Sequence, residues 1–161
     1  MNLAADGKFH GDVQLEHIVS HRTTVAWPEV IGPLTDGFKL NFYITGGEVL
    51  GPKCKGKVRP FGGDYVCLRP DGIAIIEVKG TWELDDGALI HCNYDGLADL
   101  GPDAFERTIA GDPPALTPAR AGARYYSGHP SYTWLNRLQC FAFAIIDIPA
   151  LSIYFDIYAA R

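Results

Sequence analysis

The clearest pattern in the chain is an alternation of apolar and polar residues over residues 61–96. Two clusters of turn-forming residues interrupt it, Pro70-Asp71-Gly72 and Asp85-Asp86-Gly87. In each cluster the Asp-Gly pair supplies the positive φ angle that closes a three-residue hairpin loop. The pattern therefore predicts three antiparallel strands joined by two tight turns.

The two loops also predict which residues lie opposite one another. Counting outward from them places Asp64 opposite Val78, and Val78 opposite Tyr94. Side chains alternate between the two faces of a strand, so this register collects a largely apolar set on one face. That set consists of Val66, Leu68, Ala74, Ile76, Val78, Gly80, Trp82, Leu84, Ile90 and Cys92. Asp64 and Tyr94 share this face with it.

Asp64 is the sharpest chemical signal in the sequence. A carboxyl group on an apolar face loses hydration when it ionises, so its pKa rises towards neutrality and it can give or take a proton. Two other interpretations remain open. Asp64 follows Gly62-Gly63 and could hydrogen-bond the backbone of that turn, and a register slip of one residue would move it to the solvent face.

Segments that alternate, or that are rich in β-branched and aromatic residues, predict further strands on both sides of this unit. They are residues 13–27, 38–45, 138–146 and 151–158. Residues 97–120 contain four prolines and do not alternate, so they predict an exposed connection with a helical turn near residues 102–107.

About seven to nine hairpin-connected strands with little helix indicate a sandwich or a closed barrel. We favour an all-β fold, a closed antiparallel β-barrel of about eight strands with one short helix or helical turn in a long loop. A barrel of this size leaves room inside for side chains or one small ligand. With 161 residues, we expect one barrel domain over residues 13–161 after a flexible arm over residues 1–12.

Aromatic, amide and imidazole side chains gather at residues 124–136, at the margin of the predicted strands. Such groups can stack on a flat ligand and orient it, or they can pack as the rim of a barrel. The candidate catalytic residues are Asp64, Tyr94 and Asn136. The candidate substrate-binding residues are Tyr126, Trp134, Trp82, His91 and Tyr43.

The last predicted strands are apolar on both faces. Phe141, Phe143 and Ile145 share one face, and Cys140, Ala142 and Ala144 share the other. One of these faces is then available to a partner subunit, so we expect a homodimer or a higher homo-oligomer.

Composition and charge narrow the classes of partner. A net charge of −5 argues against nucleic acid, because phosphate binding needs a basic face. No apolar run is long enough to cross a membrane, and the N-terminus lacks the basic and apolar segments of a secretory signal. The four cysteines show no CxxC spacing, so they indicate free thiols in a reducing, cytoplasmic compartment.

His17 and His21 are four residues apart, which on a helix would match a metal-binding pair. They lie in a predicted strand with no third ligand nearby, so we expect no metal site. The glycine pairs are not followed by the helix-opening GK[ST] of a phosphate loop, and we expect no cofactor.

Several linked motifs resemble one known family. They are ITGGEVLGPKCKGKV, GGDY, RPDG, TWELDDGALI, YDG, a YY pair followed by TWLNR, and a final FDIY. In this order they are similar to the bacterial and fungal family called domain of unknown function 3237, over roughly residues 13–159. The resemblance implies a barrel of about eight strands, similar to allene oxide cyclase and dirigent barrels, which turn over or steer reactive small molecules without a bound cofactor.

The family's site candidates match this sequence at Asp64, Tyr94, Trp134 and Asn136. The chain departs from the family pattern at residues 91–93 and 127–129, which indicates a specialised pocket and leaves the substrate open.

Together these features favour a cofactor-independent isomerase, cyclase or lyase. It would act by proton transfer on a small conjugated carbonyl, phenolic or nitro compound bound in the barrel. Asp64 would shuttle the proton, Tyr94 would donate a hydrogen bond to developing negative charge, and Asn136 would fix the substrate. The alternative is a non-catalytic, lipocalin-like carrier of a small apolar or aromatic ligand.

Overall fold

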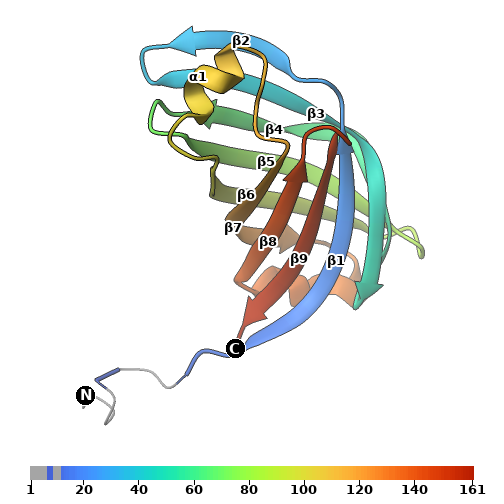
Figure 1. Ribbon diagram of the computed structural model, residues 1–161. Helices are drawn as coiled ribbons and strands as arrows, with labels where there is room; N and C mark the ends of the chain where they lie inside the picture. Colours follow the sequence, from blue (N-terminus) through green and yellow to red (C-terminus); the bar gives the residue numbers. More distant parts are fainter. Residues whose placement is uncertain (1–6, 9–11) are drawn as a thin grey trace.

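The computed structural model describes residues 7–8 and 12–161, and these form nine strands, one α-helix and one 3-10 helix (Figure 1). In chain order the elements are β1 (Leu15–Val25), β2 (Glu29–Leu34), β3 (Gly37–Pro52), β4 (Lys55–Leu68), β5 (Ile73–Leu84), β6 (Leu89–Asp99), α1 (Ala104–Ile109), β7 (Leu116–Tyr126), η1 (Pro130–Arg137), β8 (Cys140–Asp147) and β9 (Ser152–Ala160). The flexible arm predicted over residues 1–12 lies outside the described residues, apart from residues 7, 8 and 12.

Eight of the described strands close into an antiparallel barrel, which confirms the predicted fold class. Neighbours follow the order β1-β9-β8-β7-β6-β5-β4-β3, and β1 pairs with β3 to complete the circle. β2 lies outside this circle, paired with β3.

The register of the central strands is the predicted one. Asp64 lies opposite Val78, and Val78 opposite Tyr94. The first hairpin loop closes as counted, because the N–H of Arg69 donates to the carbonyl oxygen of Ile73 at 2.9 Å. The apolar face of β4, β5 and β6 therefore supplies much of the barrel interior.

The exposed connection predicted over residues 97–120 is shorter in the structure. β6 continues to Asp99 and β7 begins at Leu116, so α1 and its flanking turns make the connection. The sequence pattern does not reveal β7, because its three central inward side chains, Ala119, Ala121 and Ala123, are alanines instead of β-branched residues. Pro118 lies beyond the last residue pair with β6, so its missing N–H removes no bond from that ladder.

α1 and η1 lie at opposite ends of the barrel, since they follow the antiparallel neighbours β6 and β7 (Figure 1). η1 packs against one end, where Leu135 is fully buried. α1 covers part of the other end and buries Ala104 there. No helix among the described residues has the length and apolar character needed to cross a bilayer.

The two faces of β8 separate as the alternation predicts. The inward set is Cys140, Ala142 and Ala144, and the outward set is Phe141, Phe143 and Ile145. Arg120 covers Phe143, with its guanidinium carbon 5.0 Å from the ring centroid. Association of this outer face with a second copy of the chain stays a prediction.

Candidate functional site

A cavity of about 320 Å³ opens at the α1 end of the barrel. Its mouth is formed by α1, the segment that follows it and the chain around β2. Most of the side chains that line it are apolar; the polar ones are Asp64, Thr108, Thr117, Asp147 and Ser152. A cavity of this size and lining suits one small, mostly apolar molecule.

Asp64 lines this cavity from β4 and is 5% exposed. A β-bulge precedes it, because the β4–β5 register shifts between Val58 and Gly62. Gly62 has a φ of +92°, and an added Cβ would meet the carbonyl oxygen of Lys79 at 2.0 Å. Glycine is therefore required at this bulge, where β4 comes close to β5 just before Asp64.

One backbone donor holds the carboxyl group. The β4–β5 ladder is interrupted at Tyr65 and Val66, and the N–H of Glu77 donates instead to Oδ1 of Asp64 at 3.2 Å. Asp64 thus faces the interior, and its hydrogen-bond partner lies on the neighbouring strand. The structure excludes the slipped register, and the preceding glycine turn is not the carboxyl group's partner.

Burial raises the pKa of Asp64 from its ordinary value of 3.8 to about 7, and the hydrogen bond from Glu77 offsets only part of this rise. Both the protonated and the ionised form are therefore populated near neutral pH. A carboxyl group in this state can accept a proton from a bound molecule or return one.

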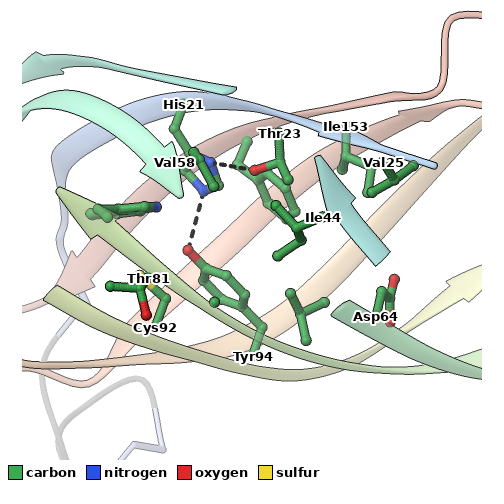
Figure 2. A pocket seen from close by; sticks show the side chains of 14 residues that line it. His21, Thr23, Val25, Ile44, Val58, Asp64, Thr81, Cys92, Tyr94 and Ile153 are labelled. Atoms are coloured by element: carbon green, nitrogen blue, oxygen red, sulfur yellow. Dashed lines mark hydrogen bonds between the residues drawn. The ribbon is translucent and has the colours of Figure 1, made fainter. Parts of the chain in front are cut away.

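A second and much smaller space, of about 20 Å³, lies in the barrel interior (Figure 2). Val25, Asp64 and Ile153 line both this inner space and the large cavity, and we call this junction the neck. Asp64 is the titratable residue of the neck. It can therefore contact a ligand on one side and the barrel interior on the other.

Four buried polar side chains, Tyr125, Tyr94, His21 and Thr23, form a hydrogen-bonded chain in the interior. Figure 2 shows the last three of them. The hydroxyl of Tyr125 donates to that of Tyr94 at 3.1 Å, and the Tyr94 hydroxyl lies 3.1 Å from Nε2 of His21. Nδ1 of His21 lies 3.2 Å from Oγ1 of Thr23. The imidazole also stacks on Phe155, with ring centroids 4.4 Å apart.

The donors of this hydrogen-bonded chain of side chains all point the same way in our assignment. Burial lowers the pKa of His21 to about 3, so its imidazole is neutral and has one N–H and one acceptor nitrogen. Tyr94 accepts from Tyr125, so we assign its own proton to Nε2 of His21. The imidazole N–H then lies on Nδ1 and donates to Thr23, which lines the inner space.

Two predicted site residues lie on the inner side of the neck. Tyr94 and Trp82 both line the inner space and are each 2% exposed, but neither lines the large cavity. Trp82 packs against His21, with ring centroids 5.0 Å apart. A molecule in the large cavity would meet Asp64 before either of them.

Asn136 and Trp134 belong to η1, at the end of the barrel opposite the cavity mouth. Asn136 clamps the backbone of Ser127, accepting from its N–H at 2.8 Å and donating to its carbonyl oxygen at 2.9 Å. Nε1 of Trp134 donates to the carbonyl oxygen of Ser131. These contacts match the alternative interpretation of this segment as a packed barrel rim.

Tyr126, His91 and Tyr43 lie on the outer surface, because their neighbours in the sequence occupy the inward positions. His91 and Tyr126 face each other across β6 and β7, with ring centroids 6.0 Å apart. The hydroxyl of Tyr43 donates to Glu29 on β2 at 2.9 Å. The structure does not bring these three side chains into either space.

The sequence pattern gave His21 and Thr23 no place in the site. A bulge in β1 between His17 and Val19 reverses the alternation, so His21 points inward while His17 contacts Ser20 on the outside. The available signal was the alternation of His21, Thr23 and Val25 at the end of this strand. In the part of the chain that the structure describes, no three His, Cys, Asp or Glu side chains gather as a metal site requires.

Comparison with known proteins places the chain in a family. The sequence profile of the family described as "Protein of unknown function (DUF3237)" matches residues 13–159. A UPF0311 protein of Rhodopseudomonas palustris is 36% identical over 107 residues, which cover 65% of this chain and 69% of that protein.

Solved structures share the fold. A conserved protein of unknown function from Rhodopseudomonas palustris superposes with a TM-score of 0.83 and 24% identity, covering 94% of this chain and 100% of its own. A structure described as an enzyme from Penicillium herquei superposes with a TM-score of 0.67 and 16% identity, covering 96% and 99%. At these identities the likeness shows the fold alone. The match over residues 13–159 shows that this chain belongs to the DUF3237 family.

Proposed function

We propose that the protein is an enzyme that moves a proton on a small, mostly apolar molecule without the help of a cofactor. The observation that carries the proposal is Asp64, a buried carboxyl group that lines an apolar cavity and has a pKa raised to about 7. Strongly perturbed carboxyl groups in cavities are candidate acid–base groups, since a pKa near the working pH suits proton transfer.

The chemistry that such a site supports begins with a carbon acid. The Asp64 carboxylate takes a proton from a carbon next to a carbonyl, nitro or phenolic group, so a C–H bond breaks and a carboxyl O–H bond forms. The electron pair enters the conjugated system of the substrate. Return of the proton to another carbon completes an isomerisation, attack by the new carbanion closes a ring, and expulsion of a leaving group gives a lyase reaction.

Two further features support this proposal. The Thr117 hydroxyl also lines the large cavity, so an oxygen of the substrate that gains negative charge has a donor within the same walls. The fold likeness to an enzyme from Penicillium herquei supports catalysis in a barrel of this architecture.

A deuterium-exchange experiment tests the proposal. Small enones, hydroxylated aromatic ketones and nitroalkanes are first screened for binding by NMR, and those that bind are incubated with the protein in D2O. We expect C–H positions of a bound compound to gain deuterium, and Asp64→Asn to slow the exchange at least about tenfold while binding persists. Asp95→Asn, the same change on the outer face of β6, is the matched control and should keep the wild-type rate.

Exchange at the wild-type rate in Asp64→Asn would remove Asp64 from the mechanism. A lipocalin-like carrier is the second candidate, favoured by the predominantly apolar lining of the cavity. It predicts that ligands bind, gain no deuterium above the rate in buffer, and are recovered unaltered.

A further inference from the structure

We propose that the large cavity selects an uncharged, elongated molecule with one polar end, and that it rejects an anion of the same shape. The polar end lies at Asp64, and the apolar body lies along the barrel strands towards the mouth. The inference rests on the proposed function for its catalytic meaning, because it names the class of substrate on which Asp64 would act. The selection itself is a property of binding and can be tested without turnover.

The lining of the cavity provides no positive charge. Among the described residues that line it, none is Lys, Arg or His, and the charged side chains are Asp64 and Asp147. An anion that leaves water for an apolar space needs a paired cation, and without one the transfer is costly. A carboxylate or phosphate group would therefore lose its hydration here and gain no ion pair.

The basic side chains in the connections at the entrance are already paired. Five segments connect strands at the α1 end of the barrel: residues 26–28, 35–36, 69–72, 100–115 and 148–151. Their basic side chains are Arg69 and Arg107. Arg69 pairs with Asp71, and Arg107 lies 3.2 Å from Asp112 and 3.9 Å from Asp103. Both guanidinium groups thus have carboxylate partners before any anion arrives.

Asp64 adds a repulsive contact against an anion. A second carboxylate brought to the neck would face the ionised Asp64 in surroundings of low dielectric, where like charges repel strongly. An uncharged amide meets no such cost, because its N–H can donate to the ionised carboxyl group and its oxygen can accept from the protonated one. The site therefore discriminates through an unfavourable charge contact as well as through fit.

The barrel strands define the length of the bound molecule. Asp64, Val66 and Leu68 are successive inward residues of β4 that line the cavity, and four residues of strand span about 13 Å. Phe42 and Phe38 line the cavity from β3, opposite Asp64 and Leu68 respectively. The path from Asp64 to the entrance is thus apolar along both strands. A molecule whose polar end lies at Asp64 must carry an apolar body of about this length.

Apolar side chains continue this path to the surface. Trp27, Val30 and Ile109 line the cavity, although they are 69%, 62% and 49% exposed. Covering apolar surface with a bound molecule is favourable. An apolar body that reaches the mouth therefore gains affinity over a shorter one.

Calorimetric titration with a matched pair of compounds tests the proposal. 4-Propylcinnamamide and 4-propylcinnamate have nearly the same shape, and they differ by one negative charge. Burial raises the pKa of Asp64 to about 7, so at pH 8 most of its carboxyl groups are ionised. At this pH we expect wild type to bind the amide at least about thirtyfold more tightly than the carboxylate.

The variant Asp64→Asn removes the repelling charge, so the ratio of the two affinities should fall by at least about tenfold. Asp95→Asn, on the outer face of β6, is the matched control and should keep the wild-type ratio. The length of the site is tested in wild type alone. Unsubstituted cinnamamide lacks the propyl group and should bind at least about tenfold more weakly than 4-propylcinnamamide.

Equal affinity of wild type for the amide and the carboxylate would overturn the proposal, and so would tighter binding of the carboxylate or no binding of either compound. A ratio that is the same in wild type and Asp64→Asn would overturn the placement of the polar end at Asp64. Equal binding of the long and short amides would overturn the elongated path. If bound compounds gain no deuterium but the charge selection is observed, the proposed enzyme activity fails and this inference does not.

Discussion

Asp64 and His21 respond to pH in opposite directions. The folded-state pKa of Asp64 is raised from 3.8 to about 7, so the folded chain keeps a proton that the unfolded chain releases. The free energy of unfolding therefore falls as pH rises from about 4 to about 7. The folded-state pKa of His21 is lowered from 6.5 to about 3, so over that window the free energy of unfolding rises with pH. In wild type the two contributions largely cancel.

The variant Asp64→Asn separates the contributions of Asp64 and His21 to the pH dependence of the free energy of unfolding. Asn can still accept the Glu77 N–H but does not ionise, so the variant loses the Asp64 contribution and keeps that of His21. We expect the stability of Asp64→Asn relative to wild type to rise between pH 4 and pH 7, by about 4 kcal/mol at most. Urea unfolding of both proteins at several pH values measures it, with Asp95→Asn as control. A stability difference that stays constant with pH would show that Asp64 titrates normally.

At the residue scale, the sequence predicts part of the site. Asp64 and Tyr94 could be found because two tight loops fix the register by counting, and no bulge lies between the loops and these residues. His21 could not be found from the sequence, because the bulge in β1 reverses the face of the strand on which His21 lies. Asn136 and Trp134 could not be placed either, since sequence does not show at which end of a barrel a rim segment lies.

At the scale of elements, the bulge in β4 brings its backbone close to β5 just before Asp64. Gly62 has φ +92° and no room for a Cβ beside Lys79, so Gly62→Ala should destabilise the protein by more than about 2 kcal/mol. Gly87 also has a positive φ, of +83°, but open space around it, so Gly87→Ala should cost about 1 kcal/mol. Chemical denaturation compares the two. Equal losses would mean that backbone conformation alone, and not the close approach of β5, requires glycine at the bulge.

The elements that the sequence predicts well are those with strong alternation. β4, β5 and β6 combine mainly apolar inward residues with mainly polar or charged outward ones, so their alternation is clear. β7 turns small alanines inward, which pack in the interior but have low strand propensity. β2 contains Gly32-Pro33, which are loop signals, and pairs with β3 outside the barrel.

At the scale of the whole molecule, the first and last barrel strands are neighbours. Leu15 lies opposite Ala160, and the N–H of Arg161 donates to the carbonyl oxygen of Gln14 at 3.0 Å. A circular permutant that links residue 161 to residue 13 by a short linker, with new ends between Thr35 and Asp36, should fold cooperatively and bind the same ligands. Those new ends interrupt the β2–β3 turn and leave the closed barrel intact.

Circular dichroism and thermal unfolding of the permutant check this expectation. A second permutant opened inside β5, between Val78 and Lys79, is the control and should not fold, because it cuts a strand paired on both sides. Cooperative folding of both permutants would contradict the view that continuous ladders around the circle hold the barrel together.

The position of Asp64 at the neck affects which end of a bound molecule can react and how related proteins can change the molecules that they accept. A molecule that enters the mouth can react at its leading end, while bulk at its trailing end extends towards Trp27 and Ile109. The acid group belongs to a barrel strand, whereas these mouth residues sit outside the closed circle of strands. Mouth residues can therefore be substituted during evolution to accept different trailing groups, while Asp64 and the strand that carries it stay the same.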